Sequence, residues 1–104
     1  MFVGSALFDL LLPAHVASLK EKRGVVRPVV AALRRLDVSV AEVGAWQLHR
    51  RAEVGVAVAS GEAKHVREVL DACERLVAGR PEVELLSVRR QLTSSTDEEF
   101  AEHG

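Results

Sequence analysis

Residues 52–92 read AEVGVAVASGEAKHVREVLDACERLVAGRPEVELLSVRRQL, and this stretch decides the fold. In residues 52–60 bulky valines alternate with glycine and alanine, which is the period of a strand with one bulky and one small face. The apolar residues that follow recur at helical spacing, so we expect a helix beginning at Ser60 or Gly61. Gly79 is placed to cap this helix, and Pro81 prevents its continuation. Residues 83–92 then predict a final strand.

The first half of the chain predicts a strand followed by a helix. Residues 2–12 (FVGSALFDLLL) are mostly apolar and indicate a buried strand, which Pro13 ends. Ser18 and Glu21 have the spacing of a capping box. Pro28 interrupts the helical pattern that follows. We therefore expect residues 18–23 to form a turn or a short helical lead-in, with the regular helix starting near Gly24. The alternative is a continuous helix that is kinked at Pro28.

Residues 38–44 predict one more strand, which completes the order β-α-β-β-α-β. This order is typical of an α+β, ferredoxin-like sandwich. Right-handed crossovers place both helices on one face of a four-stranded antiparallel sheet and leave the other face open. A half-apolar, weakly charged open face is a candidate interface. The interface candidates are Leu7, Ala57 and Ala59 on that face and Trp46 in the connection before the third strand.

Composition supports one small globular domain. The chain has 104 residues, 48% of them hydrophobic, and a net charge of −1. We expect a ferredoxin-like domain over residues 1–92 and a disordered acidic tail over residues 93–104. The single Cys73 excludes an intramolecular disulfide, and no apolar run reaches the roughly 20 residues that span a bilayer. No signal-peptide pattern occurs, so we expect a cytoplasmic protein without membrane contact.

Recognisable catalytic patterns are missing from the sequence. The four histidines lie far apart, and no phosphate-binding glycine loop or nucleophile elbow occurs. Cys73 falls in the centre of the second helix's apolar stripe, where cysteine packs as a small hydrophobe. The sequence therefore predicts a protein that is not an enzyme, with no metal and no cofactor. An enzyme of the acylphosphatase type shares the fold, but no matching anion loop follows the first strand.

Positive charge is concentrated in the first half of the chain. Residues 1–52 carry eight Lys/Arg and four Asp/Glu, whereas residues 53–104 carry six and eleven. The candidate RNA- or anion-binding residues are Lys20, Lys22, Arg23, Arg27, Arg50 and Arg51. An RNA-recognition motif has the same element order but stacks bases on aromatics of its third strand, which this chain lacks. Contact with RNA would therefore involve phosphates and shape. The alternative is that these residues form an ordinary solvated helix face, and no DNA binding is expected.

Two stretches resemble a bacterial family of unknown function, the YlxP-like proteins. They are SLKEKRGVVRPVVAALRRLDVSVAEV (18–43) and RAEVGVAVASGEAKHVREVLD (51–71), and the resemblance extends from about Val3 to Leu92. It implies a ferredoxin-like fold, no assigned catalytic residues, and association with the ribosome or RNA. The loop GAWQLHRR (44–51) departs from the family's D-H-Q-D-L-W-Q-R pattern, matching only at Leu48 and Arg51.

Two hypotheses follow from these patterns. The first is a non-enzymatic accessory protein that binds RNA or the ribosome through the basic residues. The second is a homo-oligomeric interaction module, as a dimer, or a small-ligand-binding regulatory module, in which the small face of the third strand receives the partner or ligand.

Overall fold

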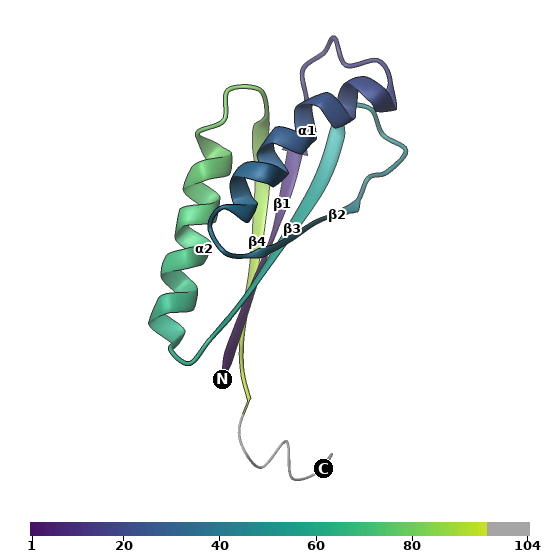
Figure 1. Cartoon of the computed structure of the whole chain (residues 1–104). Coiled ribbons are helices and arrows are strands. Elements are labelled where there is room, and N and C mark those ends of the chain that lie inside the picture. Colours follow the sequence, from purple (N-terminus) through teal and green to yellow (C-terminus); the bar gives the residue numbers. More distant parts are fainter. Residues whose placement is uncertain (96–104) are drawn as a thin grey trace.

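A computed structural model that describes residues 1–95 has four strands and two helices in the order β-α-β-β-α-β (Figure 1). Their bounds are β1 Phe2–Leu11, α1 Leu19–Arg34, β2 Ser39–Gly44, β3 Arg51–Ser60, α2 Ala63–Ala78 and β4 Glu84–Ser94. Every strand lies within one or two residues of its predicted range. The helix α2 starts two or three residues later than expected, because Ser60 is still in β3 and its hydroxyl accepts a hydrogen bond from the Glu62 amide at 3.1 Å.

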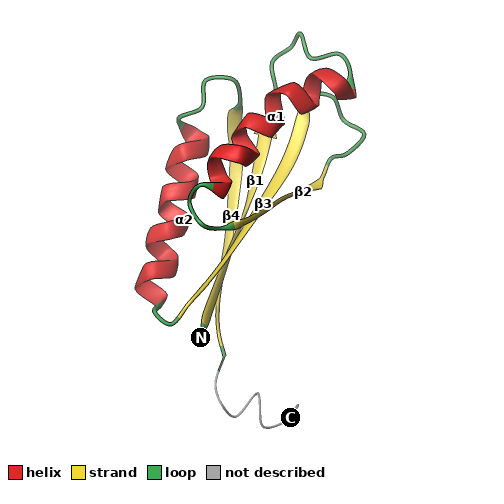
Figure 2. Cartoon of the chain, in the orientation of Figure 1, coloured by secondary structure: helices red, strands yellow, loops and turns green. Residues whose placement is uncertain are grey.

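The strands form one antiparallel sheet in the order β2-β3-β1-β4. Both helices cover the same face of this sheet, and no helix of residues 1–95 lies on the opposite face (Figure 2). In the central pair, Ser5 lies opposite Ala57, and Leu7 lies opposite Gly55. The prediction of a ferredoxin-like α+β sandwich with two helices on one face is confirmed.

The core fills the space between the sheet and the helices. It contains Phe8, Leu10 and Val54 from the central strands, with Leu33 from α1 and Val77 from α2, all fully buried. Alternate residues of β1 and β3 are buried, as the period of a strand requires. The described residues include no helix of a length and apolarity that could cross a membrane.

The close approach of α2 to the sheet depends on Gly4. A β-carbon at this position would overlap the Val66 side chain and lie 3.0 Å from Leu70 Cδ1. Both neighbours are buried residues of α2, so neither has free space into which to move. Glycine at position 4 therefore sets the distance between this helix and β1.

The helix α1 differs from its main prediction. It begins at Leu19 and continues through Pro28 to Arg34, so the expected start near Gly24 is wrong and the alternative of a continuous helix is correct. Ser18 is the N-cap, and its Oγ accepts a hydrogen bond from the Glu21 amide at 3.1 Å, as the capping box predicts. Lys22, Val26, Val29 and Leu33 form one buried face on both sides of Pro28. Burial of this face outweighs the roughly 3 kcal/mol that an interior proline costs.

The strand β4 continues two residues past the predicted domain end at residue 92. Ser94 pairs with Phe2, and the Ser95 amide donates a hydrogen bond to the Met1 carbonyl at 3.0 Å. Of the predicted acidic tail over residues 93–104, only the first three residues are described, and these lie against the N-terminus. The remaining residues, 96–104, lie outside the described part of the chain.

Candidate functional site

Lys22 is the one charged residue among the buried side chains of the described chain. Only 3% of it is exposed; its Nζ lies 3.1 Å from the Glu42 carboxylate and donates a 2.7 Å hydrogen bond to the Ala45 carbonyl. The sequence placed Lys22 among the RNA-binding candidates. The structure gives it a different role, since its ammonium group joins α1 to the end of β2 and does not face solvent.

Four other cations form a line along one side of α1. Lys20, Arg23, Arg27 and Arg34 are exposed and are spaced three, four and seven residues apart, so they share one helix side. We call them the α1 basic stripe. At 1.5 Å per residue the stripe is about 21 Å long. None of the four forms an ion pair with residues 1–95.

The α1 basic stripe borders a shallow groove of about 480 Å³ between α1 and β2. Arg23, Arg27 and Arg34 line one wall of this groove, and Ala41 and Glu42 of β2 line the other. Because β2 is an edge strand, the groove runs along the outer margin of the sandwich. The predicted Lys20, Arg23 and Arg27 are thus brought together, and Arg34 joins them.

The last two predicted cations lie elsewhere. Arg50 is the last residue of the β2–β3 connection, and its Nε donates a hydrogen bond to the Leu12 carbonyl at 3.3 Å. Arg51 makes two hydrogen bonds to the Asp9 carboxylate, which raise the pKa of its guanidinium. Since the side chains of Arg51 and Asp9 extend over the open face of the sheet, their charges largely neutralise each other there.

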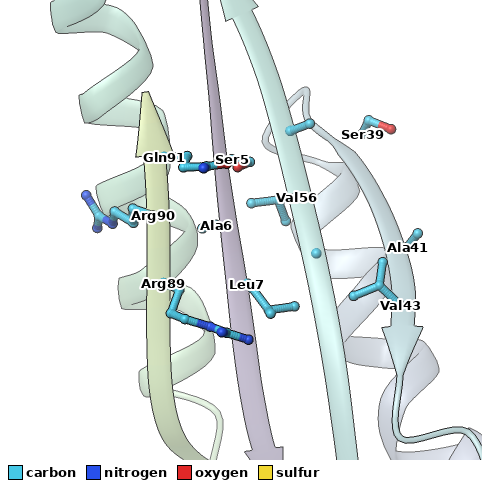
Figure 3. Close-up of a pocket in the computed structure, with 12 residues that line it drawn as sticks. Ser5, Ala6, Leu7, Ser39, Ala41, Val43, Val56, Arg89, Arg90 and Gln91 are labelled. Atoms are coloured by element: carbon cyan, nitrogen blue, oxygen red, sulfur yellow. The ribbon is translucent and has the colours of Figure 1, made fainter. Parts of the chain in front are cut away.

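A trough of about 780 Å³ occupies the centre of the open sheet face (Figure 3). Its floor is made of small or apolar side chains, among them Ser5, Leu7 and Ala57. Val43 of β2 and Arg89 of β4 lie on opposite sides of it, and Arg89 reaches towards β1 (Figure 3). The sequence predicted the small floor. It missed Arg89, which faces the trough because it lies opposite Leu7 in the register.

The placement of the interface candidates agrees with their predicted faces. Ala57 and Ala59 are exposed on the open face, and Leu7 is partly exposed beside them. Trp46 is 57% exposed and Leu48 is 53% exposed in the β2–β3 connection. More than half of each side chain is therefore accessible to a partner.

The remaining reactive groups have structural roles. Cys73 is fully buried in α2, and this burial raises the pKa of its thiol, which agrees with the prediction of core packing. Arg90 points to the helix side of the sheet, where hydrogen bonds to Asp71 at 2.7 Å and Glu74 at 2.9 Å raise its pKa. Within residues 1–95 no group of His, Cys, Asp and Glu side chains is arranged to hold a metal ion.

Solved structures share this architecture at low sequence identity. The chain is similar to the de novo designed protein Foldit4, with a TM-score of 0.55, 11% identity and coverage of 92% of this chain and 100% of that one. It is also similar to a de novo designed ferredoxin-fold protein, LFR1 1, with a TM-score of 0.51, 9% identity and coverage of 92% and 88%. A third is the N63A mutant of SnoaB, a cofactor-independent oxygenase from Streptomyces nogalater, with a TM-score of 0.50, 9% identity and coverage of 89% and 92%. At these identities the likenesses show the fold alone.

The fold defines the class as a small ferredoxin-like α+β protein. The chain belongs to the family DUF503, described as a protein of unknown function, whose model matches residues 3–90. No curated protein matches the sequence.

Proposed function

We propose that this protein is a non-catalytic accessory protein that binds RNA, on or near the ribosome, through the α1 basic stripe. The observation that carries the proposal is the alignment of Lys20, Arg23, Arg27 and Arg34 on one exposed side of a single helix. The resemblance of residues 18–43 and 51–71 to the YlxP-like proteins supports the same assignment, with action in the cytoplasm.

The spacing of the stripe suits a phosphodiester backbone. Helix positions three or four residues apart have β-carbons about 5–6 Å apart, which allows successive cations to reach separate phosphates. The charge is specific to this helix: α1 has five Lys/Arg against one Glu, a net charge of +4, whereas α2 has three of each sign. The sequence-independent part of nucleic-acid affinity comes from such phosphate contacts.

No ion pair within residues 1–95 neutralises a cation of the stripe. Glu42 lines the groove, but its carboxylate is paired with the buried Lys22. Glu21 lies at the helix N-terminus and accepts a hydrogen bond from the Ser18 hydroxyl at 3.3 Å. The stripe therefore keeps its positive potential at the margin of the sandwich, where an extended anion has access to it.

Salt dependence of binding to a short single-stranded RNA tests the proposal. Four phosphate contacts at about 0.7 released counterions each give a slope of about −2.8 in log K against log salt, so affinity falls roughly 50-fold between about 50 and 200 mM salt. The double variant R23E/R27E removes two contacts, and we expect the slope to fall by about half and the affinity by at least tenfold.

The matched control is R67E/R75E on α2. It changes the net charge by the same amount at two exposed helix positions away from the stripe. Wild-type-like binding by R67E/R75E, together with weak binding by R23E/R27E, supports the α1 basic stripe as the site. Equal losses of affinity in both variants would show non-specific attraction and refute the α1 basic stripe as the site, as would a wild-type salt slope in R23E/R27E.

Sedimentation with purified ribosomal subunits, using the same two variants, tests the ribosomal part of the proposal.

A further inference from the structure

We propose that the open sheet face is an interface between two copies of this chain, related by a two-fold axis that runs parallel to the strands between β1 and β3. The proposed interface is separate from the α1 basic stripe, which lies with α1 on the helix side of the sheet (Figure 2). It therefore stands or falls independently of RNA binding.

The floor of the trough on the open face is made of small and apolar side chains of β1 and β3, and Arg89 reaches towards it from β4. The pairs Ser5 with Ala57 and Leu7 with Gly55 lie directly opposite each other in the register, with Val3 opposite Ala59 one step further along. Val3 is 38% exposed although it belongs to a central strand. Apolar side chains exposed in the middle of a sheet are a recurrent sign of an interface.

The face is complementary to itself under the proposed symmetry. On β1 the outward apolar residues are the larger ones, Val3 and Leu7, whereas the outward residues opposite them on β3 are Ala59 and Gly55. In the strand order β2-β3-β1-β4 the centre of the sheet lies between β3 and β1. A two-fold axis at this centre places β1 of each copy over β3 of the other, so Val3 meets Ala59, and Leu7 meets Gly55 with the Val43 side chain beside it. Aligned sheets pack face to face in this way at about 10 Å.

Charge at the margins is complementary as well. Glu53 and Arg89 both lie on the open face, and neither has an ion-pair partner among the residues that the structure describes. The Glu53 carboxylate lies over Gly44, at the β2 side of the sheet. The proposed axis places β4 of one copy over β2 of the other, which brings Arg89 of each copy near Glu53 of its partner.

The available area is sufficient for a stable pair. The four strands have 10, 6, 10 and 11 residues. At about 3.3 Å by 4.8 Å per residue, the sheet presents roughly 590 Å² on each copy, or about 1,200 Å² in total. This total reaches the lower end of the range of specific protein interfaces.

The variant A57E, examined by analytical ultracentrifugation and native mass spectrometry, tests the interface. Ala57 is exposed, so a glutamate is tolerated in the single chain but is buried without a partner in the pair. We expect a wild-type dimer and an at least hundredfold higher dissociation constant for A57E. The matched control is A31E, the same exchange at an exposed site on α1, and we expect it to leave the dimer unchanged.

Charge exchange at the margins tests the arrangement with variants that leave the core untouched. R89E brings like charges together, and we expect the dissociation constant to rise about tenfold, whereas the double exchange E53R/R89E restores it to near the wild-type value. Failure of this restoration overturns the proposed axis. A wild-type chain that stays monomeric at about 100 µM overturns the interface, since we expect a dissociation constant in the micromolar range for an interface at the lower end of the specific sizes. A small molecule retained by a monomer would show that the trough has another occupant and would overturn it too.

Discussion

Replacement of Lys22 by methionine should destabilise the protein while leaving RNA affinity unchanged. The methionine fills the volume of the lysine stem but cannot replace the ion pair with Glu42 at 3.1 Å or the hydrogen bond to the Ala45 carbonyl at 2.7 Å. The lost contacts join α1 to the β2–β3 connection. In wild-type protein they compensate the desolvation of an ammonium group that is only 3% exposed.

The size of the effect follows from the burial of the two partners. Breaking a fully buried ion pair by removing one partner costs about 3–5 kcal/mol. Glu42 is 24% exposed and keeps part of its hydration, so we expect a loss of about 2–3 kcal/mol in the free energy of unfolding. In a domain of this size that loss lowers Tm by roughly 10–20 °C. In the double variant K22M/E42M no carboxylate is left unpaired, and the remaining loss should be about 1 kcal/mol, from the Ala45 carbonyl alone.

Urea denaturation followed by circular dichroism measures both variants, with Lys20→Met as the control. Lys20 is an exposed lysine on the same helix, and we expect its replacement to change the free energy of unfolding by less than about 0.5 kcal/mol. The m-value should not change in any of the three. If K22M were as stable as K20M, or if it weakened RNA binding as much as K20M under conditions where it is folded, the structural role of Lys22 would be refuted.

Three further predictions concern the backbone and the core. Gly4→Ala should cost about 1–3 kcal/mol in urea denaturation, because the new methyl group overlaps the buried Val66 side chain; a wild-type midpoint would show that α2 shifts freely. Ala45→Gly should raise the free energy of unfolding by about 0.5–1 kcal/mol, because Ala45 has a φ of 59° in the left-handed region; a loss of stability would contradict this. The Cys73 thiol should react with a thiol reagent only as fast as the chain opens. Burial raises the pKa of this thiol above the ordinary 9.0. The buried, protonated thiol therefore contributes fully to stability below that pH, and this contribution is lost as the pH rises through the folded pKa. Urea titrations at alkaline pH should show this loss in the wild-type protein and not in Cys73→Val.

Local pattern was sufficient to predict the fold class. The alternation of valine with glycine and alanine in residues 52–60, and the apolar stripe that places Cys73 in the core, depend only on the two periods of regular backbone. The capping box of Ser18 and Glu21 is equally local, and both of its residues act as predicted. Pro28 was misjudged because its effect on the start of α1 depends on packing against the sheet, and a local pattern does not contain that packing.

The assignment of charges to a site required tertiary structure. By sequence Lys20, Lys22 and Arg23 are near neighbours, yet helix rotation places Lys22 in the interior and leaves the other two in the α1 basic stripe with Arg34. Arg89 and Arg90 are likewise adjacent, but the alternation of a strand directs one to the open face and the other to α2. Sequence alone thus determined which elements form and which face of each is apolar, because these depend on neighbours within a few residues. Only the tertiary structure decided which of these cations stay free, because the ion pairs of Lys22, Arg51 and Arg90 join residues from different elements.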